Sequence, residues 1–365
     1  MGIINYKKDE NENTKTELNR INFKFELATK IQIRIGDRNF IEKIIELPQN
    51  KIGILYGIEY NKNLFLIYSS KTFTKIKQFE FFFQDAIKTE DNNLVLSYEY
   101  NIYYYELIDK EYKLIQEIQY YNKKEKIRCF EDCNYDSIDS IHSLKNGNLI
   151  AKIGEEMKIY KKDKGKFIYY KTINFKCNIE EIFEIKPNII VLFLRERLGD
   201  GCLVEGYFHY ISFYNIQNDK QNIININIKN IDDYYSIGKP FIKIGNHLIA
   251  KYADHLDIYD IEKNMKLINK DDYEIVKIKD QDSYTTEKKL KYEVPFSYFE
   301  EELKNNFIIA SKRNGQAFVY KYEDKSFKKY QEFPFDLNGA RLIKLKNDKI
   351  IIYYKDEIKV INVFY

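Results

Sequence analysis

The chain has 365 residues, of which 59 are Lys or Arg and 56 are Asp or Glu, so its formal net charge is only +3. This balance argues against direct nucleic-acid binding, because polyanion-binding proteins usually carry a one-sided basic surplus. With 44% hydrophobic and 16% aromatic residues, the chain is too apolar to be disordered. Its length would suggest two ordinary domains, but a closed array of repeats can form one large domain.

The start of the chain and its cysteines bear on where the protein works. Residues 1–17 are polar and lack a signal-peptide core, and we expect them to form a disordered tail. No window approaches the ~18 uninterrupted apolar residues of a membrane span, so no membrane partner is expected. The cysteines are few and irregularly spaced, which favours a reducing compartment. These features predict a cytoplasmic protein, with the nucleus as an alternative.

Short runs rich in Ile, Tyr, Phe and Val follow one another along the chain, and polar turns separate them, as is typical of strands. One pattern occurs seven times: an apolar strand, an Asn-rich tight turn, a second apolar strand and a third strand that ends in an aromatic residue. The turns read LPQNK, EDNN, KNGN, KPN, IGN, KNN and KND. The second strands are expected to begin at Ile52, Leu94, Leu149, Ile189, Leu248, Phe307 and Ile350. The third strands are expected to end at Tyr68, Tyr105, Tyr160, Tyr214, Tyr259, Tyr320 and, in the last copy, Ile361.

The spacing of these positions shows that the tyrosines are not scattered at random. From the second-strand start to the third-strand end, the offset is 11 residues in four copies, 13 in one, and 16 and 25 in the other two. Tyrosine at such a strand end is most simply part of the core, with its hydroxyl near the rim. We therefore interpret the repeated tyrosines as residues that pack between neighbouring sheets.

A polar hairpin and a fourth run follow each of the first six aromatic residues. The six runs read KIKQFEF, KLIQEIQY, FIYYKTINF, IININI, YEIVKI and KKYQEF. Each copy is therefore predicted to be a four-stranded antiparallel sheet of ~40–60 residues, the size of a propeller blade. Helical periodicity is nearly absent, and Ser297–Lys304 is the best helical candidate.

The two ends of the repeat array complement each other. The seventh copy lacks a fourth strand, whereas a strand-like run, Ile21–Ile35, precedes the first copy within residues 18–36. Placing this run in the last blade removes an open sheet edge. The sequence thus predicts an all-β, seven-bladed β-propeller over residues 18–365, closed by its N-terminal strand.

The third strands also carry a family resemblance. A WD40 repeat typically ends its third strand in apolar-x-apolar-Trp-Asp; here the fifth copy reads LDIYD over 256–260, and the second reads IYYYE over 102–106. Over roughly residues 20–365 the chain resembles a divergent WD40-like repeat protein with Tyr in the place of the Trp. The chain has no Trp and no clear Gly-His pair, so a kelch or other propeller lineage stays an alternative.

Patterns that would signal catalysis or metal binding are weak. Cys129 and Cys133 could supply two zinc ligands, but we interpret them as loop cysteines because no second pair is spaced to complete the site. The histidines, which also lack ligand spacing, are His142, His209, His247 and His255. There is no Gly-rich phosphate loop and no G-x-S-x-G nucleophile elbow. We therefore expect no catalytic residue, no metal or other cofactor and no small-molecule ligand.

The placement of longer links points to one side of the ring. In an antiparallel four-stranded blade, the link between strands two and three and the link to the next blade share one face, here called the top face. The remaining links lie on the bottom face. The predicted insertions are nearly all top-face links: 121–136, 195–206, 229–238 and 279–295. Loops on a rigid scaffold often bind partners, so the top face is the predicted docking surface for a protein or peptide.

Arginine and tyrosine are enriched at interface hot spots, and both types fall in or beside these loops. The candidate partner-binding residues are Arg128, Arg195, Arg197, Tyr207, Tyr234, Tyr235, Tyr284 and Arg313. The sequence therefore favours a non-catalytic protein-interaction scaffold. Two alternatives stay open: a propeller hydrolase or lyase with a site at the channel mouth, and a structural subunit of a large complex, ribonucleoprotein complexes included.

Overall fold

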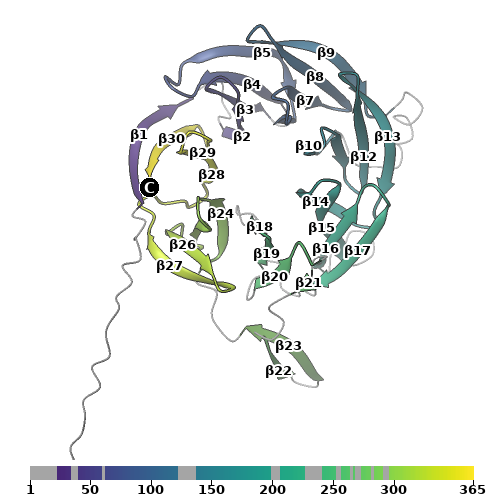
Figure 1. Cartoon of the computed structure of the whole chain (residues 1–365), viewed down its shortest axis with the longest axis vertical. Coiled ribbons are helices and arrows are strands. Elements are labelled where there is room, and N and C mark those ends of the chain that lie inside the picture. The colour runs from purple at the N-terminus through teal and green to yellow at the C-terminus, as the bar shows by residue number, and fades with distance from the viewer. Residues whose placement is uncertain are drawn as a thin grey trace, which may run out of the picture.

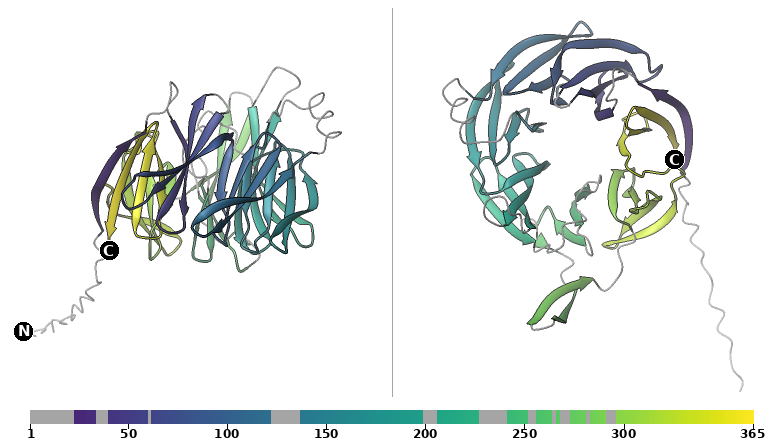
Figure 2. Two further views of the ribbon diagram at one scale, coloured as in Figure 1. Left: turned by 90° about the horizontal axis from the view of Figure 1, so that it is seen from above. Right: turned by 180° about the vertical axis from the view of Figure 1, so that it is seen from behind.

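The computed structural model describes residues 23–33, 40–59, 62–121, 137–198, 206–226, 241–251, 256–263, 266–267, 273–280, 283–290 and 296–365. Seven four-stranded antiparallel sheets stand around a central channel, as Figure 1 shows. The side view in Figure 2 shows a disc whose strands run between its two faces. Within these residues, no helix is long and apolar enough to span a membrane.

Each blade runs in chain order from its first strand to its fourth. Blade one is β2 (Phe40–Leu47), β3 (Lys51–Glu59), β4 (Lys62–Ser69) and β5 (Lys75–Phe83). Blade two is β6 (Asp85–Lys88), β7 (Leu94–Tyr98), β8 (Asn101–Ile108) and β9 (Glu111–Gln119). Blade three is β10 (Ser140–Ser143), β11 (Leu149–Ile153), β12 (Glu156–Asp163) and β13 (Lys166–Asn174). Blade four is β14 (Asn178–Lys186), β15 (Ile189–Leu198), β16 (Gly206–Asn215) and β17 (Lys220–Ile226).

The last three blades follow the same order, except that the final strand comes from the N-terminal part of the chain. Blade five is β18 (Phe241–Ile244), β19 (His247–Lys251), β20 (Leu256–Asp260) and β21 (Lys266–Leu267). Blade six is β24 (Tyr298–Glu302), β25 (Phe307–Ser311), β26 (Ala317–Glu323) and β27 (Ser326–Glu332). Blade seven is β28 (Arg341–Lys344), β29 (Lys349–Tyr354), β30 (Glu357–Phe364) and β1 (Lys24–Gln32).

The Asn-rich turns form because the first hairpin of a blade needs a left-handed backbone conformation. The φ angle is 57° at Asn50, 65° at Asn92 and 65° at Asn188. Asn tolerates this region better than most residues, because its short polar side chain bonds to the local backbone. In blade three, Gly147 takes the same role with a φ angle of 82°.

The sequence repeat corresponds to backbone pairing between the second and third strands. The predicted second-strand start lies directly opposite the predicted third-strand end in five blades: Ile52 and Tyr68, Leu94 and Tyr105, Leu149 and Tyr160, Leu248 and Tyr259, Ile350 and Ile361. In blades four and six the pairing shifts by one residue, to Ile190 with Tyr214 and Ile308 with Tyr320. The variable offset in the sequence therefore reflects the length of the intervening loop and not the position of the pair.

The hydrophobic core is divided among the interfaces between neighbouring blades. The described residues form seven buried clusters, and each cluster joins one pair of adjacent blades. The repeated third-strand residue always faces the preceding blade. Tyr259, for example, is 1% exposed and packs edge-on against Phe213 of blade four, with ring centroids 5.7 Å apart. The interpretation of these tyrosines as blade-to-blade core is therefore confirmed.

The N-terminal strand closes the ring, as the sequence predicted. Strand β1 pairs antiparallel with β30, and the sheet order of blade seven is β1-β30-β29-β28. A side chain from blade six holds the start of this strand: Gln331 Nε2 donates to the Phe23 carbonyl at 3.0 Å, and the Phe23 N–H donates to Gln331 Oε1 at 3.3 Å. Gln116 of blade two forms the same two bonds with Phe167 of blade three, both at 2.8 Å. The closing strand is thus held in the same way as an internal one.

The helical candidate Ser297–Lys304 is wrong, because this segment contains strand β24. Phe299 is fully buried in the cluster between blades five and six and pairs with Ala310 of β25. Burial of this ring and backbone pairing outweigh the weak local preference of a Glu-rich segment for helix.

The assignment of YEIVKI as the fourth strand of blade five is also wrong. That place is taken by β21, which follows β20 after a short link and pairs with it. The YEIVKI run lies in β22 (Tyr273–Asp280), which pairs with β23 (Ser283–Leu290) in a separate two-stranded sheet outside the ring (Figure 1). Strand β21 pairs with β20 in place of β22 because it is nearer in the sequence, and a shorter loop costs less entropy to close. The insertion therefore begins at 268, before the predicted 279–295.

Removing residues 1–36 should destabilise the whole ring, because the deletion removes β1 and leaves the edge of β30 unpaired. Removing only residues 1–17, the predicted polar tail, which lies outside the described residues, should leave stability unchanged. Thermal unfolding of both truncated proteins against the full chain measures the difference. Equal melting temperatures for the two deletions would show that β1 is dispensable.

Replacing Tyr259 by Ala should lower the free energy of unfolding by about 3 kcal/mol, because it removes a buried ring from a blade interface. Tyr259→Phe should cost about 1 kcal/mol, since the ring stays and the hydroxyl bond to Asp257 Oδ2, at 2.9 Å, is lost. Urea unfolding gives both values. Tyr169→Ala is the control, because Tyr169 is 57% exposed; a cost equal to that of Tyr259→Ala would contradict the assignment.

Candidate functional site

Most of the predicted partner-binding residues have no described side chain. Arg128, Tyr234 and Tyr235 lie outside the described residues. The structure describes the backbone of Arg197 and of Tyr207, which pair with each other near the top ends of β15 and β16. The strand register therefore brings these two predicted residues together.

The other three predicted residues lie on separate elements. Arg195 Nε is 2.9 Å from Glu180 Oε1 of the neighbouring strand, so its guanidinium is partly engaged within blade four. Arg313 is exposed in the link between β25 and β26. Tyr284 lies in β23, in the hairpin outside the ring. The predicted set is thus spread over blades four and six and the β22–β23 hairpin.

A pocket of about 360 Å³ opens on the top face between blades six and seven. Its walls combine carboxylates and lysines with the ring of Tyr354, which is 47% exposed. The turn that carries Arg313 lies beside this pocket. It is held to the link between blades six and seven, because the Leu337 N–H donates to the Gly315 carbonyl at 2.9 Å, and Asp336 and Asn338 of that link line the pocket. No sequence pattern predicted this pocket, since two short links that carry no insertion form much of its wall.

The first strands of the blades line the central channel and place one residue from each blade at the same level, near the bottom face. Each of these residues pairs with the second-strand residue that lies opposite the repeated third-strand position. We call this set the channel ring; in blade order it is Glu46, Lys88, Ser143, Glu184, Lys243, Glu302 and Lys344. Positive and negative residues alternate around it, and Ser143 stands at the one uncharged position.

Several side chains of the channel ring reach back to the backbone of the preceding blade. The bonds are Glu46 Oε1 with the Lys346 N–H at 2.9 Å, Glu184 Oε2 with the Lys145 N–H at 2.6 Å, Lys243 Nζ with the Ile185 carbonyl at 3.1 Å and Lys344 Nζ with the Glu302 carbonyl at 3.4 Å. Carboxylates accept from N–H groups and lysines donate to carbonyls. These members of the channel ring therefore tie adjacent blades together.

A cavity of about 460 Å³ lies in the lower half of the channel, which is a typical volume for a small-molecule site. Five blades contribute to it: one, two, three, four and seven. Its apolar wall is formed by Ile45, Ile87, Ile141, Leu144, Ile182, Phe183 and Ile343. Its polar wall is formed by Lys43, Glu46, Lys88, Glu90, His142, Ser143, Glu184 and Lys344. No pattern in the sequence predicted this cavity, because its residues come from strands far apart in the chain.

His142 is the one imidazole among the residues that line this cavity. The pKa of His142 is lowered to about 4, mainly by burial; Asp85 opposes this shift, and Lys43 and Lys152 add to it. Its Nε2 lies 3.0 Å from Ser140 Oγ. At neutral pH the imidazole is therefore uncharged, with one ring nitrogen that donates a hydrogen bond and one that accepts.

The pair of Ser140 and His142 resembles a nucleophile and its base, which in enzymes are oriented by a third group. The nearby carboxylate is Asp85, and its oxygens are engaged elsewhere. Oδ1 contacts Lys43 Nζ at 2.7 Å and the Ala86 N–H at 2.8 Å, and Oδ2 accepts from the Ile141 N–H at 2.9 Å. The described arrangement thus offers polar ligand contacts, but it does not place a carboxylate on the imidazole.

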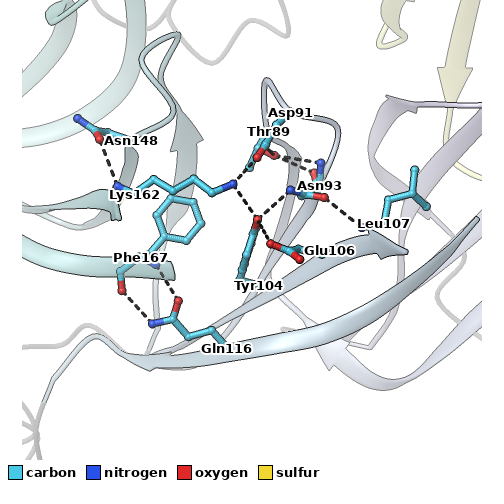
Figure 3. Close-up of polar contacts among 10 residues, drawn as sticks. All are labelled: Thr89, Asp91, Asn93, Tyr104, Glu106, Leu107, Gln116, Asn148, Lys162 and Phe167. Atoms are coloured by element: carbon cyan, nitrogen blue, oxygen red, sulfur yellow. Dashed lines mark hydrogen bonds and ion pairs between the residues drawn. The ribbon is translucent and has the colours of Figure 1, made fainter. Parts of the chain in front are cut away.

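A second polar cluster, between blades two and three, ties the blades together (Figure 3). The Tyr104 hydroxyl accepts from Asn93 Nδ2 at 2.8 Å and from Lys162 Nζ at 2.9 Å, and it donates to Glu106 at 3.2 Å. Lys162 also forms an ion pair with Asp91. Every group drawn has a partner within the protein, so this cluster is structural.

Metal binding finds no support in the residues that are described. Among them, no group of three or more His, Cys, Asp or Glu side chains could hold a metal ion. Cys129 and Cys133, the pair considered from the sequence, lie outside the described residues. Cys177 is half-buried and packs against the cluster between blades three and four.

Comparison with known proteins identifies the fold. The sequence matches no family model and no curated protein. The chain is a seven-bladed β-propeller. It is similar to BBS1N, solved in complex with ARL6DN, with a TM-score of 0.54, 10% identity, and coverage of 93% of this chain and 96% of that one. It is also similar to a streptogramin B lyase, with a TM-score of 0.56, 11% identity, and coverage of 94% and 99%. Identities this low show a shared propeller architecture alone.

Acidification should destabilise the protein through His142. Between pH 6.5 and about 4 the unfolded chain binds a proton at this residue that the folded chain excludes, so the free energy of unfolding falls as the pH falls, by at most about 1.4 kcal/mol per pH unit. His142→Gln should flatten the dependence in this window, measured by urea unfolding at several pH values. The same flattening in His247→Gln, whose imidazole contacts Tyr322 in blade six, would contradict the assignment.

Proposed function

We propose that this propeller is a non-catalytic scaffold that binds a protein or peptide partner on its top face. The observation that carries the proposal is the unequal length of the links on the two faces. On the bottom face no link between described strands exceeds five residues, whereas the top face has links over 120–139, 227–240 and 268–297. Insertions restricted to one face of a rigid ring are typical of recognition loops.

Two described features of the top face support this proposal. The link over 268–297 contains the paired strands β22 and β23, so the longest insertion forms an ordered arm outside the blades. The pocket between blades six and seven presents Tyr354 among charged residues, beside the turn that carries Arg313. A half-exposed tyrosine with polar neighbours is a suitable anchor for a partner side chain.

We also propose a WD40-like lineage, in which Tyr stands where the repeat Trp is usual. Its support is that the six repeated tyrosines and Ile361 occupy buried third-strand positions facing the preceding blade. The similarity to BBS1N, a propeller crystallised with a protein partner, is consistent with a scaffold. A cytoplasmic location fits the cysteine usage described above.

The alternative is an enzyme, hydrolase or lyase, with its site in the channel. One observation favours it: the cavity that holds His142 and the carboxylates of the channel ring. The similarity to a streptogramin B lyase is consistent with this alternative at the level of the fold. The engagement of Asp85 by Lys43 and the backbone is the reason that we rank it second.

The experiment is partner capture with matched variants on the two faces. The tagged protein is incubated with native lysate, and its partner is identified by mass spectrometry and then purified. Arg313→Ala with Tyr354→Ala, and Arg195→Ala with Arg197→Ala, should each weaken binding of that partner about tenfold or more, as hot-spot losses do. The melting temperature of the Arg313 and Tyr354 variant should change little, because both side chains are exposed.

The control changes two exposed bottom-face lysines of blade three, Lys145→Ala and Lys164→Ala, which lie in the turns after β10 and β12. This double variant should bind the partner as the original protein does. If the control abolishes binding and both top-face variants retain it, the partner docks on the bottom face and the proposal fails.

A further inference from the structure

Three consecutive members of the channel ring, Lys88, Ser143 and Glu184, have polar groups that the described residues satisfy incompletely. Ser143 Oγ and Glu184 Oε1 are buried and have no hydrogen-bond partner among the described atoms. Lys88, on the other side of Ser143, forms no ion pair with any carboxylate of the described chain; the side chain of Lys346 lies next to it, and Glu46 and Glu90 act on it from a distance. All three side chains line the 460 Å³ cavity.

Two of these three positions differ from the other side of the ring. Glu46, Lys243 and Lys344 each bond to the backbone of the preceding blade, whereas Lys88 and Ser143 make no such bond among the described residues; Glu184 makes one, through Oε2 with the Lys145 N–H, and leaves Oε1 without a partner. Seven positions cannot alternate in charge without one break, and the break falls at Ser143. The short serine side chain leaves space between a cation on blade two and a carboxylate on blade four.

We infer that this gap is a binding site for a small zwitterion of the α-amino-acid type. The ligand's carboxylate would face Lys88, and its ammonium group would donate to Glu184 Oε1 and Ser143 Oγ. Burying an unsatisfied polar atom costs free energy, so a ligand that supplies the missing partners gains what the empty site lacks. Rotation of Ser143 toward the cavity breaks no bond of its Oγ, and Glu184 Oε1 is the carboxylate oxygen left over while Oε2 holds the Lys145 N–H.

The rest of the cavity wall selects the ligand's side chain. Ile87, Ile141 and Phe183 flank the three polar groups in the first strands of blades two, three and four. Because these residues are apolar, an amino acid with an aliphatic or aromatic side chain buries apolar surface there. The inference concerns the bottom half of the channel and is independent of the partner proposed for the top face.

The test is isothermal titration calorimetry of the full chain with L-leucine and L-phenylalanine, alongside thermal unfolding. Binding should appear as measurable heat and as a melting temperature that rises with ligand concentration. L-leucinamide lacks the carboxylate, and N-acetyl-L-leucine lacks the ammonium group. Each should bind at least about tenfold more weakly, because one charged group of the site is left without its partner.

Substitutions in the channel ring test whether the amino acid binds at Lys88, Ser143 and Glu184. Lys88→Met and Glu184→Gln should each weaken leucine or phenylalanine binding about tenfold or more. Lys243→Met is the matched control: it lies at the same level of the ring but outside the cavity wall and acts on Glu184 from a distance, so affinity should change much less. Ser143→Gln should abolish binding without lowering the melting temperature, because its amide fills the gap and can bond to both neighbours.

The inference is overturned if neither amino acid binds, or if N-acetyl-L-leucine binds as tightly as L-leucine, which would show anion binding by lysines alone. It is also overturned if Lys243→Met weakens binding as much as Glu184→Gln does. The top-face variants at Arg313 and Tyr354 should retain leucine binding, so failure of this inference and failure of the scaffold proposal give different results.

Discussion

The burial of both faces of every blade is the constraint on which this structure depends. Each sheet packs against two neighbours, and the seven described core clusters all lie between blades. A single blade would expose an apolar face, so the repeats are stable only in a closed array. This is why β1, distant in sequence from β30, completes blade seven, and why Gln331 holds its start as Gln116 holds an internal strand.

In the closed ring, the two faces and the channel have different structural features. The bottom-face links are short because Asn, Gly and Asp at positive φ angles allow tight turns there. The top-face links carry the added chain, including the β22–β23 arm. The channel ring joins blades through its charged side chains, and an odd number of blades forces one interruption in its alternating charge. The proposed partner and the proposed ligand therefore use different parts of one rigid ring.

The sequence by itself determined the number of blades, the strands that pair and the positions that pack between blades. It could do so because a β-ladder fixes register: a second-strand residue such as Leu149 faces a third-strand residue such as Tyr160 wherever the loop between them is short. Closure by the first strand followed from the missing fourth strand of the last copy. These features are local or repeat at intervals, so they leave a mark on the sequence.

Only the tertiary structure decided which segment takes an edge and which side chains meet in the channel. In blade five the short β21 pairs with β20, whereas the YEIVKI run pairs with β23 outside the ring. Both runs have the composition of a strand, so composition does not distinguish them; the length of the loop that must close does. Ser297–Lys304 becomes a strand because Phe299 is buried between two blades. Lys88, Ser143 and Glu184 come from three blades and meet only because the ring closes, so no spacing in the chain could reveal their cavity.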